Sequence, residues 1–126
     1  MFAHTKAFSG FSVNDLKAAK TFYQDKLGIN VKEESEMPVL QLQIEGGIPV
    51  LLYQKDNHEP ATYTVLNFPV QNIDEAVDQL RAKGIEFLQY EGNMKTDEKG
   101  ISRNNGGPQI AWFEDPAGNI LSVLQE

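Results

Sequence analysis

The chain contains no cysteine among its 126 residues. Disulfide bonds, thiolate metal ligands and cysteine nucleophiles are therefore excluded, and the absence is compatible with a cytoplasmic protein. Histidine is also scarce, with only His4 and His58. No apolar run approaches the roughly 20 residues that a membrane-spanning helix needs. No basic segment followed by an apolar core opens the sequence, so we expect neither a membrane protein nor a secretory signal.

Basic residues are in the minority, since 11 lysines and arginines face 18 aspartates and glutamates and leave a formal net charge of −7. This balance argues against a nucleic-acid partner, because phosphate binding needs a basic surface. The acidity either aids solubility or attracts a cationic ligand. With 40% hydrophobic and 23% charged residues, the composition is that of a globular protein in water.

An internal repeat is the main feature that the sequence does contain. Val13-Asn14-Asp15-Leu16 opens an amphipathic stretch that ends at Gly28, and Val70-Gln71-Asn72-Ile73 opens a second stretch that ends at Gly84. Strand-like residues precede and follow each stretch. A repeat of about half the chain predicts two copies of one supersecondary unit.

The first copy has the pattern of a strand, a helix and three more strands. Alternation predicts a strand over Lys6–Val13, and Asn14 or Asp15 supplies the N-cap of a helix that ends at Gly28. The three strands that follow are predicted at Asn30–Glu34, Val39–Glu45 and Pro49–Gln54. Residues 55–60 are polar and form the expected hinge between the copies.

The second copy repeats this order. Thr62–Val70 is a predicted strand, the apolar stripe from Ile73 to Leu80 predicts a helix, and residues 92–108 form a glycine-rich polar loop. The remaining predicted strands are Ile85–Glu91, Gln109–Glu114 and Asn119–Leu124.

These elements predict an α+β fold with two β-α-β-β-β modules in a single domain spanning residues 1–126. Module 1 covers about residues 1–56 and module 2 about residues 61–126. A helix covers only one face of a sheet, so the second face of each sheet needs a partner. Two such faces together enclose a cavity of the kind that holds small molecules.

The ordered motifs resemble those of the vicinal oxygen chelate superfamily, which includes glyoxalase I, extradiol dioxygenases, and fosfomycin and bleomycin resistance proteins. The motifs are Val13-x-Asp15-Leu16, Phe22-Tyr23, Leu27-Gly28 and Phe113-x-Asp115-Pro116-x-Gly118-Asn119. The resemblance spans essentially the whole chain. It implies paired modules with a cupped sheet and, in many members, a homodimer, but the fold alone does not give the reaction.

The resemblance also implies where a metal ion would be held. Metal-dependent members use His and Glu or Gln side chains on strands that face the cavity. Carried over by distance from the shared motifs, these positions are Phe8, Val65 and Ser122, with Val50 as an approximate fourth. Phe and Val have no lone pair to donate and a Ser hydroxyl is a weak ligand, so we predict no metal and no other cofactor.

The predicted ligand site is an apolar wall with a few polar groups, on strand positions that share one face by alternation. It suits a flat or partly aromatic organic molecule. The positions Val50 and Leu52 belong to it only if the fourth mapped position is correct. The predicted ligand-binding residues are Phe8, Val50, Leu52, Tyr63, Val65, Asn67, Trp112 and Ser122.

Three functions remain open at this point. The first is a metal-independent small-molecule binding protein, a homodimer similar to the bleomycin resistance branch, with unknown catalytic residues if it has any. The second is a glyoxalase-like lyase or isomerase, or a dioxygenase, with a metal held by non-standard ligands such as His4, His58 or Glu59. The third is a structural or regulatory dimer whose cavity is filled by side chains. The loop at residues 92–108 is either a lid or a charged surface loop.

Overall fold

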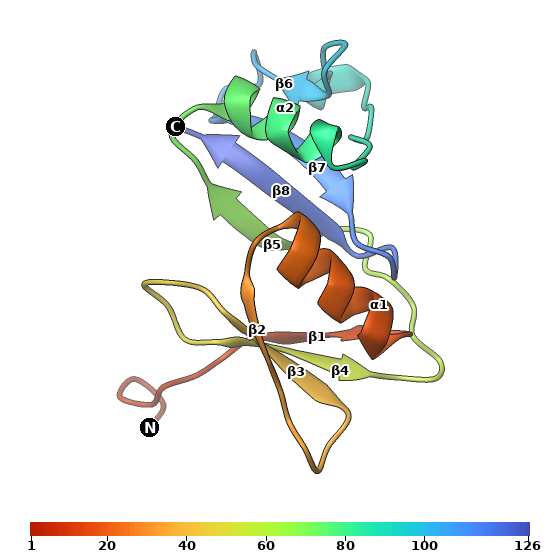
Figure 1. Ribbon diagram of the computed structural model, residues 1–126. Helices are drawn as coiled ribbons and strands as arrows, with labels where there is room; N and C mark the ends of the chain where they lie inside the picture. Colours follow the sequence, from red (N-terminus) through yellow and green to blue (C-terminus); the bar gives the residue numbers. More distant parts are fainter. The chain divides into compact units, whose positions relative to one another are not determined.

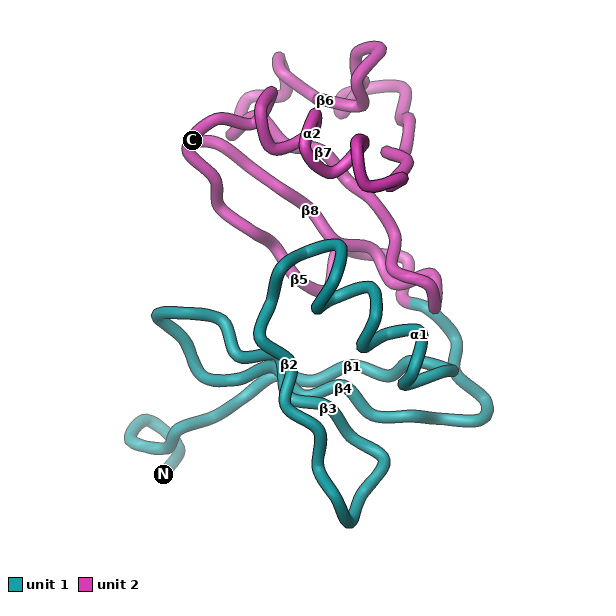
Figure 2. Tube along the Cα trace, in the orientation of Figure 1, with its two compact units in different colours: residues 1–60 teal, residues 61–126 magenta.

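The computed structural model describes residues 1–126, which divide into two compact units, Met1–Pro60 and Ala61–Glu126 (Figures 1 and 2). Each unit combines one main helix with one four-stranded mixed sheet. The prediction of an α+β fold with two βαβββ-like modules is therefore confirmed. Neither helix has the length and the apolarity that crossing a bilayer requires.

Unit 1 contains the strands β1 (Gly10–Val13), β2 (Asn30–Glu33), β3 (Val39–Gln43) and β4 (Val50–Gln54). Its helical segment consists of α1 (Leu16–Thr21) and a π-helical turn, η1 (Phe22–Lys26). The strand order is β1-β4-β3-β2, with β1 parallel to β4 and the other neighbours antiparallel. The strand predicted from Lys6 begins only at Gly10, four residues later.

The helical segment of unit 1 begins at a side-chain cap and ends at a glycine. The Asp15 carboxylate accepts hydrogen bonds from the backbone N–H groups of Lys17 at 3.0 Å and Ala18 at 3.2 Å. These are two of the donors that a helix start leaves without a helical partner. Gly28 follows the last turn at φ 70°, where a residue without Cβ has no steric penalty.

The core of unit 1 lies between its helical segment and one face of its sheet. Phe11, Leu40 and Leu52 occupy neighbouring positions on three adjacent strands and are all buried. The Phe11 ring contacts the ring of Tyr23 from η1, with 6.4 Å between centroids. This register fixes which strand positions face the helix and which face away from it.

Unit 2 contains the strands β5 (Thr64–Pro69), β6 (Ile101–Ser102), β7 (Gln109–Glu114) and β8 (Ile120–Gln125). Its helices are α2 (Ile73–Ala82) and a single 3₁₀ turn, η2 (Gly92–Met94). The strand order is β5-β8-β7-β6, with β5 parallel to β8. This order repeats the topology of unit 1.

Helix α2 packs on one face of its sheet and is tied to it by a side-chain cap. Asn72 accepts from the N–H of Glu75 at 3.0 Å, and the amide oxygen of Gln125 accepts from the N–H of Ile73 at 2.8 Å. The apolar stripe that defines this helix is buried against the sheet. The helix contributes Ile73 and Val77 to this core. The facing strands β7 and β8 contribute Ala111, Phe113, Leu121 and Val123.

The strand predicted at Ile85–Glu91 does not form. This segment makes a single bridge, Phe87 to Phe113, and one hydrogen bond from the N–H of Leu88 to the carbonyl of Trp112 at 2.9 Å. Gly92, at φ 81°, then turns the chain away from β7. The edge position of the sheet is taken by the two-residue strand β6, inside the segment that was expected to be a loop.

Candidate functional site

In each unit the helix covers one face of the sheet, and we call the opposite face the open face. On the open face of unit 2, Trp112, Ser122 and Asn67 stand side by side on β7, β8 and β5. Their neighbours along the strands, Phe113 and Leu121, point to α2 and are fully buried. We call these three residues the open-face row.

The centre of the open-face row is a pair of polar side chains. The Ser122 hydroxyl donates to the amide Oδ1 of Asn67 at 2.5 Å. Ser122 is fully buried, whereas Asn67 is exposed. The hydrogen bond satisfies the buried hydroxyl, and the exposed carboxamide is the polar group that the pair presents.

The aromatic end of the row is an edge-to-face pair. The Tyr90 ring meets the Trp112 indole with 5.1 Å between centroids and 86° between planes. Trp112 is 9% exposed and Tyr90 is 37% exposed. This packing holds the indole in one orientation, as expected for aromatic pairs of this geometry. Tyr90 was not among the predicted ligand-binding residues.

The structure does not extend the row regularly to Val65 and Tyr63. Thr64 pairs with Ile120 and Leu66 pairs with Leu121, so the register of β5 against β8 shifts at Val65. The alternation of faces along β5 therefore cannot be extended from Asn67 through Val65 to Tyr63. Tyr63 precedes β5 and is 69% exposed.

In unit 1, two of the predicted residues lie on the face opposite to the expected one. Leu52 pairs with Phe11 and Leu40 and is fully buried on the helix side, and Val50 has the same parity on β4. Leu51 and Tyr53 occupy the open face instead. The mapped position in β4 was uncertain by a residue, and a shift of one residue changes the face.

Phe8 lies before β1 rather than on it, and its side chain is 66% exposed. The chain there makes no strand ladder, since β1 begins at Gly10 and the first hydrogen bond to β4 runs from Leu51 N–H to the carbonyl of Ser9. The parity of β1 nevertheless places Gly10 and Ser12 on the open face, because Phe11 and Val13 face the helix.

A serine and a histidine meet at the end of β1. The Ser12 hydroxyl and Nδ1 of His58 are 2.6 Å apart and partly buried. The N–H of His58 also donates to the carbonyl of Lys55 at 3.1 Å. Ser12 was not among the candidate residues, because a contact between residues 46 positions apart leaves no local pattern in the sequence.

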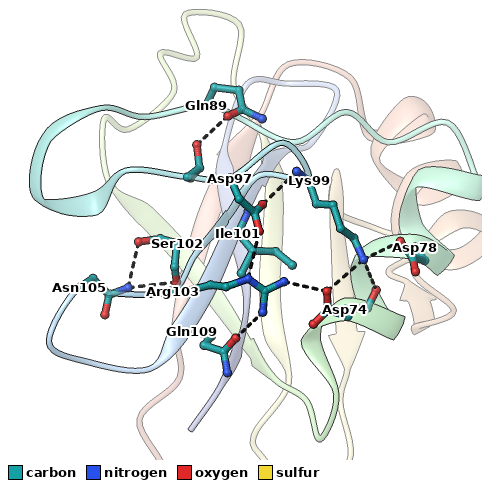
Figure 3. A network of polar contacts seen from close by, with 11 residues as sticks. Asp74, Asp78, Gln89, Asp97, Lys99, Ile101, Ser102, Arg103, Asn105 and Gln109 are labelled. Carbon is teal, nitrogen blue, oxygen red and sulfur yellow. Dashed lines mark hydrogen bonds and ion pairs between the residues drawn. The ribbon is translucent and has the colours of Figure 1, made fainter.

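The charged residues of the 92–108 segment form an ion network with α2 (Figure 3). Arg103 donates to Asp74 at 2.7 Å and to Asp97 at 3.0 Å, and Lys99 lies 3.1 Å from Asp74 and 2.9 Å from Asp78. Hydrogen bonds from Arg103 and then Lys99 hold the pKa of Asp74 below its ordinary value. These side chains fasten the segment to the helix, which favours a surface role over a lid for them.

Asp97 organises the turn inside this segment. Burial raises the pKa of its carboxyl, but hydrogen bonds from the Ile101 N–H, Arg103 and the Lys99 N–H lower it further than burial raises it. The carboxylate thus accepts from backbone and side chain together. The pKa of Lys99 is raised by its hydrogen bonds to Asp78 and then to Asp74.

The residues at the family's metal positions do not fit a divalent cation. Phe8 and Val65 offer no donor atom, and the hydroxyl of Ser122 is bonded to Asn67. Elsewhere, no group of three or more His, Asp and Glu side chains is arranged to hold a metal ion.

Unit 1 has a groove of about 880 Å³ between the helical segment and the β2–β3 hairpin. It lies on the helix side of the sheet, away from the predicted ligand-binding residues. Its walls carry charges of both signs, and Lys20 and Glu33 form an ion pair across it at 3.5 Å. A wide groove lined largely by charged and polar side chains lacks the mostly apolar lining of a small-molecule site.

Comparison with known proteins identifies the family. The family model of the Glyoxalase/Bleomycin resistance protein/Dioxygenase superfamily matches residues 2–123. The chain therefore belongs to this superfamily. Among curated proteins, it is 24% identical to YraH of Bacillus subtilis, an uncharacterised protein, over 90% of this chain and 91% of YraH.

Solved structures confirm the glyoxalase-type fold. A superfamily member from Sphaerobacter thermophilus superposes with a TM-score of 0.74 at 22% identity, with 100% of both chains covered. TnmS3, an antibiotic binding protein from Streptomyces sp. CB03234, gives 0.72 at 20% identity over 99% of this chain and 98% of TnmS3. The fosfomycin resistance protein FosX of Listeria monocytogenes gives 0.72 at 18% identity over 100% and 95%.

Proposed function

We propose that this protein binds a small organic molecule without the help of a metal ion, against the open face of the sheet of unit 2. The open-face row carries the proposal: a fixed indole, a buried hydroxyl and an exposed carboxamide stand on three adjacent strands. A few polar groups on an otherwise apolar wall are typical of small-molecule sites.

Several of the residues predicted from the sequence belong to the proposed site. Trp112, Ser122 and Asn67 of unit 2 form its centre, and Val65 and Tyr63 lie beyond the register shift on the same edge of the sheet. In unit 1, the register of β4 puts Leu51 and Tyr53, and not Val50 and Leu52, on the open face of its own sheet. Tyr90 joins the site through its contact with the indole.

The comparison with TnmS3 supports the same class of function. TnmS3 is described as an antibiotic binding protein, and its chain and this one share the fold over nearly their full lengths. We carry over from it only the use of this fold to bind an organic molecule. The proposal also keeps the homodimer and the cytoplasmic location that the sequence favours, and sedimentation analysis of the purified chain tests the first.

The experiment is a thermal-shift screen of a small-molecule library in buffer with a chelator. A ligand at a hundred times its dissociation constant stabilises the folded protein by about 2.7 kcal/mol, which such a screen detects. Trp112→Ala is expected to abolish the shift. Phe2→Ala, a matched aromatic truncation at a residue that is 77% exposed, is expected to leave it unchanged. Shifts that survive Trp112→Ala would place the ligand elsewhere.

The rival proposal is a metal-dependent lyase, isomerase or dioxygenase that uses His4, His58 or Glu59. It is tested by incubating the protein with zinc, nickel, manganese or iron(II), dialysing it and measuring the bound metal. Stoichiometric retention that is lost in His4→Ala or His58→Ala would support this rival. If no metal is retained and the library screen is silent, the third function, a structural dimer with a filled cavity, gains support.

A further inference from the structure

We infer that the ligand of the open-face row carries a neutral hydrogen-bond acceptor, such as a ketone or amide carbonyl, attached to an aromatic ring. This inference rests on the proposed function and adds the chemistry of the ligand to it. It follows from which atoms of Asn67 and Ser122 are used by their own hydrogen bond, and from the charge of the surrounding strand positions.

The Asn67–Ser122 pair presents a donor. A serine hydroxyl has one proton, and that of Ser122 is directed to Oδ1 of Asn67 at 2.5 Å. The amide oxygen therefore already accepts a hydrogen bond, while Nδ2 of the same carboxamide carries two further protons. Because Asn67 is exposed and Ser122 is fully buried, the amide N–H₂ is the group of this pair that meets a ligand. The amide N–H₂ donates to a carbonyl oxygen and cannot accept a hydrogen bond from an ammonium.

The positions around the pair are almost free of charge. On the open face, Ile110 and Leu124 flank the row on one side and Ile120 flanks it on the other. The one ionisable side chain among the β7 and β8 positions of this face is Glu114, which pairs with Ile120 at the strand end. A carboxylate there disfavours an anionic acceptor, so a neutral carbonyl fits better than a carboxylate or phosphate.

The aromatic part of the ligand is assigned to the other end of the row. Trp112 lies two strands from Asn67, which corresponds to about 10 Å between the backbones at the usual strand spacing. A ring beside the indole therefore leaves room for a carbonyl group to reach the amide. Tyr90 meets Trp112 edge to face and supplies a second aromatic contact that is 37% exposed.

Three probes with one carbon skeleton test this inference: acetophenone, ethylbenzene and 1-phenylethylamine. They present an acceptor, no polar group and a cationic donor. Binding is followed by NMR at the indole N–H of Trp112, which is the only tryptophan of the chain. We expect acetophenone to bind about three- to tenfold more tightly than ethylbenzene, which is the range for one net hydrogen bond.

Asn67→Asp is the decisive variant, because it replaces the amide N–H₂ with an oxygen and keeps the shape of the side chain and the acceptor for Ser122. We expect it to weaken acetophenone about tenfold and to favour 1-phenylethylamine. Asn93→Asp adds the same charge at an exposed position in η2 and is expected to change neither affinity.

The outcomes separate the inference from the proposed function. If ethylbenzene binds as tightly as acetophenone, or Asn67→Asp leaves their ratio unchanged, the inference is wrong and the binding site stands. If none of the three probes shifts the indole signal, the inference is also wrong. The proposed function fails only if the library screen is silent as well.

Discussion

Nη2 of Arg103 lies 2.7 Å from Oδ1 of Asp74. This ion pair joins the 92–108 segment to the first turn of α2, and its two residues are 29 positions apart in the sequence. Lys99 reaches the same carboxylate at 3.1 Å. Asp74 also lies in the first turn of α2, where the backbone N–H groups favour negative charge. The ion network therefore supports the segment and the helix at once.

Breaking this ion pair is expected to loosen the segment without unfolding the protein. In Arg103→Gln, we expect amide hydrogen exchange over residues 95–108 to rise by roughly tenfold, because the ion pairs of Arg103 with Asp74 and Asp97 are both lost. Arg81→Gln is the matched control, since Arg81 is an exposed arginine of α2 outside the ion network. Equal exchange in the two variants would contradict the structural role given to Arg103.

The lowered pKa of Asp74 predicts how stability depends on pH. A carboxyl whose pKa is lower in the folded state contributes stability above its unfolded value, here 3.8, and loses that contribution as pH falls through the folded value. Urea unfolding of the wild type is therefore expected to lose stability below about pH 4, and Asp74→Asn to lose less over the same range. Parallel curves for the two proteins would show that Asp74 is not held by Arg103 and Lys99 in solution.

The turn between β7 and β8 depends on one carboxylate. Asp115 accepts from the N–H groups of Ala117 and Asn119, each at 2.9 Å, and from the Asn119 side chain at 3.0 Å. We expect Asp115→Ala to lower the free energy of unfolding by about 2–4 kcal/mol, because buried donors lose their acceptor. Urea denaturation measures the loss. Asp56→Ala, at an exposed position before β5, should change it by less than about 0.5 kcal/mol.

Two glycines with positive φ should respond very differently to alanine. A Cβ on Gly100, at φ 88°, would lie 2.6 Å from Cβ of Phe87, whereas one on Gly106, at φ 79°, would meet nothing within 4 Å. Gly106→Ala is expected to cost about 1 kcal/mol through its backbone conformation alone. Gly100→Ala adds an overlap with Cβ of the half-buried Phe87 and is expected to cost about 3 kcal/mol or more. Thermal unfolding of both variants gives the comparison, and similar losses would contradict the packing of Gly100 against Phe87.

The helices and most strands were predictable because their signals are local. Asp15 and Asn72 mark both helix starts, and both act as caps in the structure. The strand expected at Ile85–Glu91 has the right composition, but only Phe87 bridges to β7. Composition indicates only that a segment is able to form a strand. Whether it pairs along its length with a neighbouring strand depends on its tertiary context.

The candidate site was predicted less completely, because its residues depend on register. Asn67 and Ser122 do come together, as alternation on β5 and β8 suggested. The register of β4 puts Leu52 on the helix side, so its predicted place on the cavity face was wrong. Val65 falls at a register shift that no sequence pattern marks. The contact between Ser12 and His58 joins residues 46 positions apart and leaves no local trace.

The most direct test of metal-independent binding is to measure ligand affinity at Trp112 in protein treated with a chelator and again after divalent metals are added. The account predicts that hits from the library screen shift the indole signal of the chelated protein, with the same affinity after metal addition and no metal retained on dialysis. Binding that appears only with a stoichiometrically retained ion would contradict it.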